Sequence, residues 1–201
     1  WGANPAVAHP VMFRWISEAA GEDDSRLLVV DPVETDTATA ADEHVQLDPG
    51  ADLALARAVL AEIVDRGAVD RAFVDEATTG FDDLVADLPD PAVAADEAGV
   101  TPETVADLAA AFEDRTLVYW GMGINQSVRG TDAARALIDL CLASGNLRPG
   151  SGPFSLTGQA NSMGTRICSS KGSWPGQRPF EDPDHRRRVA DHWGVPVDRL
   201  P

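Results

Sequence analysis

The sequence predicts an α/β fold with mostly parallel sheets. Two observations point to this class: short apolar runs alternate with helical periodicity over residues 27–66, and a second strand–turn–helix pattern occupies residues 117–144. Strands that alternate with helices along a chain are typical of parallel sheets. With 201 residues, 44% of them hydrophobic, the chain is long enough to form one large or two small domains around a sizeable core.

The first third of the chain contains regular alternation. Its expected elements are a helix at 9–20, a strand at 27–30, a short helix at 35–41, a weak strand at 44–47 and a helix at 53–66. Asp52 is expected to cap the last of these helices, and Gly67 is expected to end it.

The middle of the chain is helical before it returns to a strand. The expected elements are short helices at 70–77, 81–88 and 92–98, a helix from 102 to about 114, a strand at 117–120 and a helix at 131–144. Thr101-Pro102-Glu103 combines a cap, a proline at the first helical position and an acid in the first turn. A domain boundary is expected near residue 100, giving regions 1–100 and 101–201. No helix is expected after Ser144; residues 145–164 are interpreted as an ordered loop that lines a ligand, and residues 165–188 as irregular.

Two glycine turns are the strongest candidates for a binding site. One follows the strand at 117–120 as Gly121-Met122-Gly123, and the other opens the chain as Trp1-Gly2-Ala3-Asn4. Glycine lets the backbone come close to a ligand, and turns of this kind hold phosphates and nucleotides in α/β proteins. Two such turns suggest either two phosphate-bearing groups or one long ligand held at both ends.

Charge excludes some classes of partner. The net charge is −17, with 33 acidic and 16 basic residues, so nucleic acid and anionic membranes are not expected partners. No apolar run reaches the 18 or so residues of a membrane span. A salt-adapted host explains the acidic surface, and the cytoplasm is the expected compartment. Cys141 and Cys168 fit neither a disulfide framework nor a zinc pattern, so both are expected to be free thiols.

Four segments taken together carry a family resemblance. They are WGANPAVAHP (1–10), VVDPVETDTATAADEHVQLDPGAD (29–52), YWGMGINQSVRGTD (119–132) and GPFSLTGQANSMGTR (152–166). At these separations they resemble the middle of the molybdopterin-guanine-dinucleotide oxidoreductases, and the last segment resembles the nitrate reductase branch. The resemblance implies two Rossmann-like three-layer α/β lobes, incomplete because both ends of the chain look cut.

The resemblance also implies a Mo-bis(molybdopterin guanine dinucleotide) cofactor and the residues that contact it. These residues are Trp1, Gly2, Ala3, Asn4, Asp31, Pro32, Val33, Glu34, Thr35, Gly50, Ala51, Asp52, Met122 and Gln126. A diphosphate at a helix N-terminus would lie against the first turn. Other interpretations stay open: Asn4 as an ordinary turn or cap residue, Asp52 as a helix cap and Met122 as a packing residue.

The implied reaction is the two-electron reduction of nitrate to nitrite. Arg166 is expected to bind the anion through a planar fork, with Gln159 as a second donor and Met122 as a wall of the pocket. Thr157, Asn161 and Met163 would lie nearby. Arg166 could instead be a surface partner of the many acids. The chain departs from many relatives at Ala160 and after Arg166.

The remaining implications concern parts outside the sequence. In the resembled family, the cysteine ligand of molybdenum and the cysteines of a [4Fe–4S] cluster lie upstream of the first turn, so no metal ligand is named here and the fragment alone is expected to be inactive. The electron donor is a further protein or domain. The alternatives are formate or another small anion as substrate, and a nucleotide-binding Rossmann-like module without redox chemistry.

Overall fold

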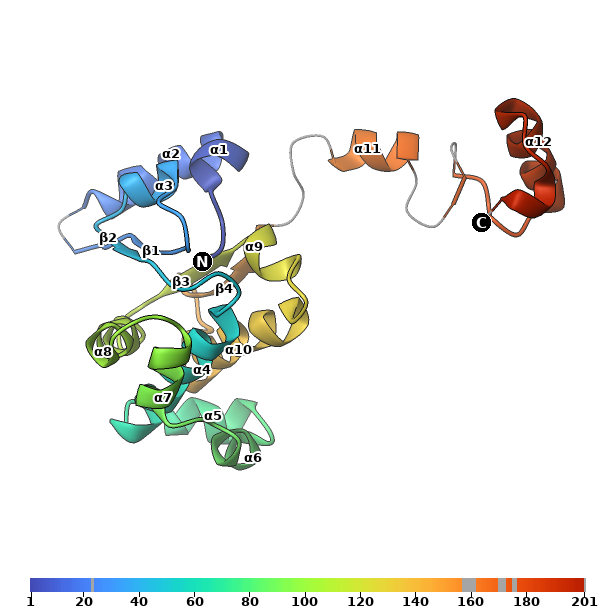
Figure 1. Cartoon of the computed structure of the whole chain (residues 1–201). Helices are drawn as coiled ribbons and strands as arrows, with labels where there is room; N and C mark the ends of the chain where they lie inside the picture. The colour runs from blue at the N-terminus through green and yellow to red at the C-terminus, as the bar shows by residue number, and fades with distance from the viewer. Residues whose placement is uncertain (23, 157–161, 170–172, 175–176, 201) are drawn as a thin grey trace. The chain divides into compact units, whose positions relative to one another are not determined.

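The computed structural model describes residues 1–22, 24–156, 162–169, 173–174 and 177–200, and it forms two compact units, Trp1–Thr157 and Gly158–Pro201 (Figure 1). The elements of the first unit are α1 (Pro5–Ala8), α2 (Pro10–Ala20), β1 (Leu28–Val30), α3 (Asp36–Thr39), β2 (Glu43–Val45), α4 (Asp52–Asp65), α5 (Arg71–Ala77), α6 (Phe81–Ala86), α7 (Pro91–Glu97), α8 (Pro102–Ala111), β3 (Leu117–Trp120), α9 (Met122–Asn125), α10 (Gly130–Ala143) and β4 (Gly152–Ser155). Those of the second are α11 (Ser162–Ser169), α12 (Pro183–Trp193) and a 3₁₀ turn, η1 (Val197–Arg199).

The strands of the first unit form two parallel pairs. β1 pairs with β2, with Val29 opposite His44, and β3 pairs with β4, with Tyr119 opposite Phe154. Helices α1–α3 lie on one side of these strands in Figure 1, and α4, α8 and α10 lie on the other. The expected α/β class with parallel strands is thereby confirmed.

The core lies between the strands and the long helices. α4 and α10 contribute its fully buried side chains, among them Leu55, Ile63, Leu137 and Leu140. These residues recur on one face at helical spacing, which is why the sequence pattern located both helices correctly. The core continues across residue 100, because α7 and α8 both pack on α4. A lobe boundary near residue 100 stays a prediction for the longer protein.

Side-chain caps fix the ends of the connecting helices. The side chains of Asp70, Asp90 and Thr101 each accept a hydrogen bond from a first-turn amide of α5, α7 and α8 respectively. Three helices at 70–98 and the start of the helix at Pro102 are therefore confirmed. The expected cap by Asp52 is wrong: the N-cap of α4 is Ala51, no side chain caps it, and Asp52 is the first helical residue.

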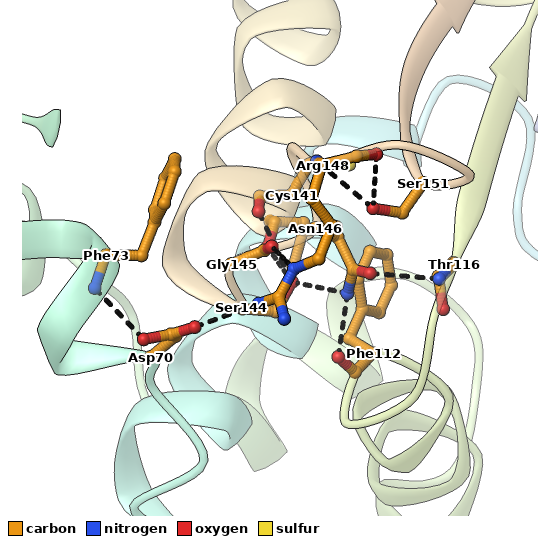
Figure 2. A network of polar contacts seen from close by, with 11 residues as sticks. Asp70, Phe73, Phe112, Thr116, Cys141, Ser144, Gly145, Asn146, Arg148 and Ser151 are labelled. Atoms are coloured by element: carbon orange, nitrogen blue, oxygen red, sulfur yellow. Dashed lines mark hydrogen bonds and ion pairs between the residues drawn. The ribbon is translucent and has the colours of Figure 1, made fainter.

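Buried Asn146 joins the ends of three elements of the first unit (Figure 2). Its Oδ1 accepts from the amide of Thr116 at 2.9 Å, and its Nδ2 donates to the carbonyl of Phe112 at 2.9 Å and to Oγ of Ser144 at 3.0 Å. The amide thus ties the end of α8 and the start of β3 to the end of α10. This position determines where β3 begins.

The loop that follows is also held by polar contacts (Figure 2). Arg148 donates through Nε to the carbonyl of Gly145 at 2.8 Å and forms an ion pair with Asp70 at 3.0 Å. Ser151 Oγ donates to the carbonyl of Arg148 and its amide donates to the same oxygen. The loop thereby returns the chain to the edge of β3, where Gly152–Ser155 pairs as β4 although a loop is expected there.

The second unit has a small aromatic core of its own. Trp174 is buried and packs edge-on against Phe180 and Trp193, with ring centroids 4.6 and 5.8 Å away. α12 begins at Pro183 with Asp182 as its cap. The expectation of no helix after Ser144 is therefore wrong.

Within the described residues, no helix combines the length and apolar character that a membrane span needs.

Candidate functional site

The first segment of the chain lies between the two strand pairs (Figure 1). The amide of Gly2 donates to the carbonyl of Val30 at the end of β1, at 2.9 Å. The main-chain nitrogen of Trp1 donates to the carbonyl of Tyr119 in β3, at 2.7 Å. Trp1 and Gly2 therefore bring the carboxyl ends of β1 and β3 together, which is the edge of a parallel sheet where α/β proteins bind ligands.

The two glycine turns pack directly on each other. Gly123 donates its amide hydrogen to the carbonyl of Gly2 at 3.0 Å. A Cβ on Gly123 would lie 2.6 Å from that oxygen, and a Cβ on Gly121 would lie 2.9 Å from Cβ of Ala3. Gly2 itself has a φ of +55°, a conformation that favours glycine. These glycines permit one turn to approach the other. The approach to a ligand that the sequence predicts stays a prediction.

The first-turn amides of the helix that follows the first turn are paired within the protein. α1 is only four residues long, begins with Pro5, which has no N–H, and the amide of Ala6 already donates to Oγ1 of Thr37 at 3.0 Å. The next two amides donate to the carbonyl of Asn4. The amides of Ala6, Val7 and Ala8 thus all have partners within the protein, and the diphosphate expected at the first turn stays a prediction.

Asn4 is held by α3 instead of capping α1. It occupies the N-cap position, but its side chain makes no cap hydrogen bond. Its Oδ1 accepts a hydrogen bond from Oγ1 of Thr37 at 2.7 Å, and Thr37 is buried. Interpreting Asn4 as an ordinary cap is thus excluded, and Thr37 is a site residue that the sequence pattern did not reveal.

Asp52 contacts the first residue of the chain. Its Oδ1 accepts from Nε1 of Trp1 at 2.9 Å. Burial raises the pKa of the Asp52 carboxyl, and the charge of Asp31 acts in the same direction, while the hydrogen bond from Trp1 opposes both. Asp31 and Asp52 are therefore electrostatically coupled at the strand ends.

The loop after β1 is fixed through its backbone. Oδ1 of Asp31 accepts from the amide of Val33 at 2.9 Å, in a local turn. His44 Nε2 contacts the carbonyl of Asp31 at 2.9 Å, and Gln46 donates to the carbonyl of Pro32 at 3.0 Å.

Three further residues complete this loop. Thr35 caps α3, while Val33 and Glu34 are exposed. The loop thus presents its side chains outward from a fixed backbone. His44 and Gln46, both on or just after β2, are supporting residues that the sequence pattern did not identify.

The turn before α4 presents backbone at the same end of the unit. Gly50 is exposed with a φ of +85°, and Ala51 is the N-cap of α4. The amide of Ala51 donates to the carbonyl of Asp48, and the amide of Asp48 donates to the carbonyl of Ala98. Gly50 and Ala51 are therefore placed next to Asp52 by a turn that α7 anchors.

The second glycine turn leads into α9. Met122 is half-buried at the start of this helix, and Gln126 is exposed just after it. Nε1 of Trp120 donates to Oδ1 of Asn125 at 3.1 Å, and Nδ2 of Asn125 contacts Oγ of Ser155 at 3.3 Å. Asn125 thus links the carboxyl ends of β3 and β4, another contact that the sequence pattern did not reveal.

Most of the residues predicted to bind or surround the anion lie in the segment 157–166. Thr157, Gln159 and Asn161 lie outside the described residues. Arg166 lies in α11, and its side chain also lies outside the described part of the structure. Met163, in the same helix, is exposed. The roles given to these residues stay predictions.

The two cysteines are not bonded to each other. Both are free thiols, as expected; Cys141 is buried and Cys168 is exposed. Burial raises the pKa of the Cys141 thiol to about 12, so it stays protonated and inert at neutral pH. Over the residues that the structure describes, no group of three or more His, Cys, Asp and Glu side chains could hold a metal ion.

Comparisons with known proteins identify the family of this chain. The family model of the molybdopterin oxidoreductases matches residues 1–189. The chain is 66% identical over its whole length to an assimilatory nitrate reductase from Haloferax mediterranei, of which it covers 28%. It is 34% identical to a nitrate reductase from Synechocystis, with 99% of this chain and 29% of that protein covered.

Two more distant relatives carry other names. Formate dehydrogenase H from Escherichia coli is 30% identical, with 97% of this chain and 28% of that protein covered. The solved structure of acetylene hydratase from Pelobacter acetylenicus superposes with a TM-score of 0.63 at 26% identity, covering 70% of this chain and 20% of that one. The chain spans less than a third of the curated relatives it matches. It belongs to the molybdopterin oxidoreductase family, whose cofactor is a molybdenum–pterin.

Proposed function

We propose that this chain is the part of a molybdenum-dependent nitrate reductase that holds both arms of a guanine-dinucleotide form of the cofactor. The observation that carries the proposal is the 66% identity to an assimilatory nitrate reductase over all 201 residues. The binding surface is the shared edge formed by Trp1–Asn4, Asp31–Thr35, Gly50–Asp52 and the turn at Gly121.

Asp52 has the chemistry that a guanine requires. A carboxylate can accept from the N1–H and N2–H of guanine together, and each of its oxygens has two lone pairs. Oδ1 uses one lone pair for Trp1, which leaves acceptor capacity on both oxygens. Burial raises the pKa of this carboxyl, so new donors from a ligand would relieve its lost hydration. The Asp52 carboxylate is therefore better suited to the neutral N–H donors of guanine than to a negatively charged phosphate.

The other predicted contacts divide by chemistry. Asn4 offers an amide donor, suited to a phosphate or carbonyl oxygen, and the fixed backbone after β1 offers groups for a ribose. Gly50 and Ala51 lie beside Asp52 and would contact the same nucleotide. Met122 and Gln126 follow the second glycine turn, where the second dinucleotide would lie. The surface thus has separate places for two arms.

When bound, the molybdenum centre supplies the electron-transfer and oxygen-atom chemistry of the reaction, in which nitrate, two electrons and two protons give nitrite and water. This chain binds and orients the cofactor arms. Arg166 would bind the planar anion through its guanidinium fork, with Gln159 as a further donor. A [4Fe–4S] cluster and an electron donor, both outside this chain, would deliver the electrons. The cytoplasm stays the predicted compartment.

The test is turnover by the full-length protein with nitrate and with formate, using an artificial electron donor or acceptor. Nitrate reduction is expected. Formate oxidation is the second candidate, because formate dehydrogenase H is 30% identical across 97% of the chain. Turnover of formate without turnover of nitrate would contradict the nitrate proposal and leave the cofactor proposal standing.

Arg166→Ala separates substrate binding from cofactor binding. The variant is expected to raise KM for nitrate at least tenfold, since a bidentate charged contact is lost, while the molybdenum content stays at the wild-type level. Loss of molybdenum from this variant would show that Arg166 belongs to the cofactor site instead.

A further inference from the structure

Asn4 and Thr37 form a buried hydrogen-bond chain at the strand ends. The amide of Ala6 donates to Oγ1 of Thr37 at 3.0 Å, and Oγ1 of Thr37 donates to Oδ1 of Asn4 at 2.7 Å. Thr37 is 3% exposed. The three residues come from two elements, α1 with its N-cap and α3, so the chain joins the first turn to the loop after β1.

The hydroxyl of Thr37 decides which way the Asn4 amide faces. Because Oγ1 accepts from Ala6, its single proton is free to be donated, and the Asn4 atom beside it must accept. That atom is therefore Oδ1. The separation of 2.7 Å is also typical of O–H···O rather than N–H···O hydrogen bonds.

The reversed amide would leave a group unpaired. It would place Nδ2 against Oγ1, and the Thr37 proton would then need another acceptor. Among the described residues, no other acceptor for this hydroxyl is recorded. Leaving a buried proton unpaired disfavours that orientation by about tenfold or more.

The consequence is a donor that has no partner among the described residues. With Oδ1 fixed by Thr37, Nδ2 of Asn4 is the free group of the amide, and in the described part of the chain nothing accepts from it. Asn4 is half-buried, so this donor is available to a ligand at the strand ends.

We infer that Thr37 is a positioning residue for cofactor binding: its hydroxyl fixes the Asn4 amide so that Nδ2 donates to an acceptor oxygen of the cofactor. This inference rests on the proposed function. The acceptor oxygen belongs to a phosphate or a pterin carbonyl, because an ammonium or amide N–H group could not accept a hydrogen bond from Nδ2 of Asn4. α3 is held in turn by Thr35, whose Oγ1 accepts from the amide of Ala38 at 3.2 Å. The loop after β1 and the first turn therefore act on the cofactor together.

The test compares variants of the full-length protein that keep or remove the hydroxyl. Thr37→Val removes the proton at nearly constant volume, and Thr37→Ser keeps it. Thr39→Val is the matched control, because Thr39 lies in the same short helix, is exposed, and bonds the carbonyl of Thr35 rather than Asn4. The readout is molybdenum and guanine nucleotide retained per polypeptide after dialysis at a fixed low urea concentration.

Thr37→Val is expected to retain the cofactor about tenfold less well, which corresponds to about 1.4 kcal/mol, whereas Thr37→Ser and Thr39→Val retain it as the wild type does. Equal retention by Thr37→Val and the wild type would overturn the inference. Loss in Thr37→Ser equal to that in Thr37→Val would also overturn it, since the hydroxyl would not be the determinant.

Asn4→Asp covers the case in which Thr37→Val does not fold. It keeps an acceptor for Thr37 but replaces the Nδ2 donor by an oxygen, so the same loss of about tenfold is expected. In the double variant, Thr37→Val should add less than about twofold to the loss of Asn4→Asp, because Thr37 acts through Asn4. Full additivity, or unchanged retention in Asn4→Asp, contradicts the inference. A wild-type protein that carries no molybdenum would instead overturn the proposed function.

Discussion

Replacing Gly123 by alanine tests whether the two glycine turns must touch. The new Cβ would lie 2.6 Å from the carbonyl oxygen of Gly2 and 3.0 Å from its carbonyl carbon, so backbone rather than a flexible side chain obstructs it. Separating the turns also weakens the hydrogen bond from Gly123 to Gly2, now 3.0 Å long.

The magnitude follows from three terms. Overpacking against backbone costs about 1–3 kcal/mol, and the lost hydrogen bond costs roughly 1 kcal/mol. The lower entropy of the unfolded alanine chain offsets roughly 0.4–1 kcal/mol of this. The net local destabilisation is about 1–3 kcal/mol, and the carboxyl ends of β1 and β3 should separate more often as a result.

Hydrogen–deuterium exchange of the full-length protein measures this locally. A decrease of about 1–3 kcal/mol in the free energy of local opening predicts faster exchange of the peptides that contain Gly2 and Gly123, by roughly five- to 150-fold. Gly21→Ala is the control, because its φ is −79° and the nearest atoms lie 3.5 Å or more from the new Cβ. Exchange within about twofold of the wild type in Gly123→Ala would refute the reasoning.

Four further outcomes are expected. Asn146→Ala should destabilise the first unit by about 2–4 kcal/mol, since it leaves the amide of Thr116 and the carbonyl of Phe112 unpaired; peptides at 112–118 that exchange as in the wild type would contradict this. Asp52→Asn should lower the retained guanine nucleotide without lowering stability, because the amide oxygen still accepts from Trp1. As burial raises the folded pKa of Asp52, its ionisation opposes folding at neutral pH, and this cost should disappear in the wild type as pH falls through that raised pKa. The net charge is −17, so acidic side chains repel one another in the folded protein. The urea concentration at the midpoint of unfolding should therefore rise between about 0.1 and 1 M KCl, because salt screens this repulsion. A midpoint that does not change with salt would argue against charge repulsion.

Local patterns located most of the first unit correctly. The strand at 117–120 matches β3, and α8 begins at Pro102 with Thr101 as its cap, because both depend on neighbours within a few residues. Periodic apolar residues likewise identified α4 and α10. These signals lie in short windows of sequence, so no tertiary information is needed to read them.

Sequence predictions were wrong where contacts between residues far apart in the chain determine the structure. Aspartate is a common helix cap, but the side chain of Asp52 instead accepts a hydrogen bond from Trp1, 51 residues away. β4 contains Gly152 and Pro153, both poor strand residues, and it forms because β3 provides a parallel edge. Helix α12 is different, since Asp182 and Pro183 are a local start signal that was available in the sequence.

Site prediction shows the same division. Motifs placed the candidate residues at the strand ends, where the first turn and the loop after β1 do meet. The supporting residues Thr37, His44 and Asn125 had no motif, because their roles come from hydrogen bonds to residues of other elements. The glycines of the two turns were predicted to let backbone approach a ligand, and the contact between the turns that these glycines also permit had no sequence signal.

The guanine nucleotide released per molybdenum atom from the purified full-length protein tests the central claim most directly. Acid hydrolysis followed by chromatography and metal analysis gives both quantities from one sample. Two guanine nucleotides for each molybdenum are predicted, one for each arm at the edge formed by Trp1, Asp52 and the turn at Gly121. Molybdenum without guanine nucleotide, or no molybdenum, would contradict the account.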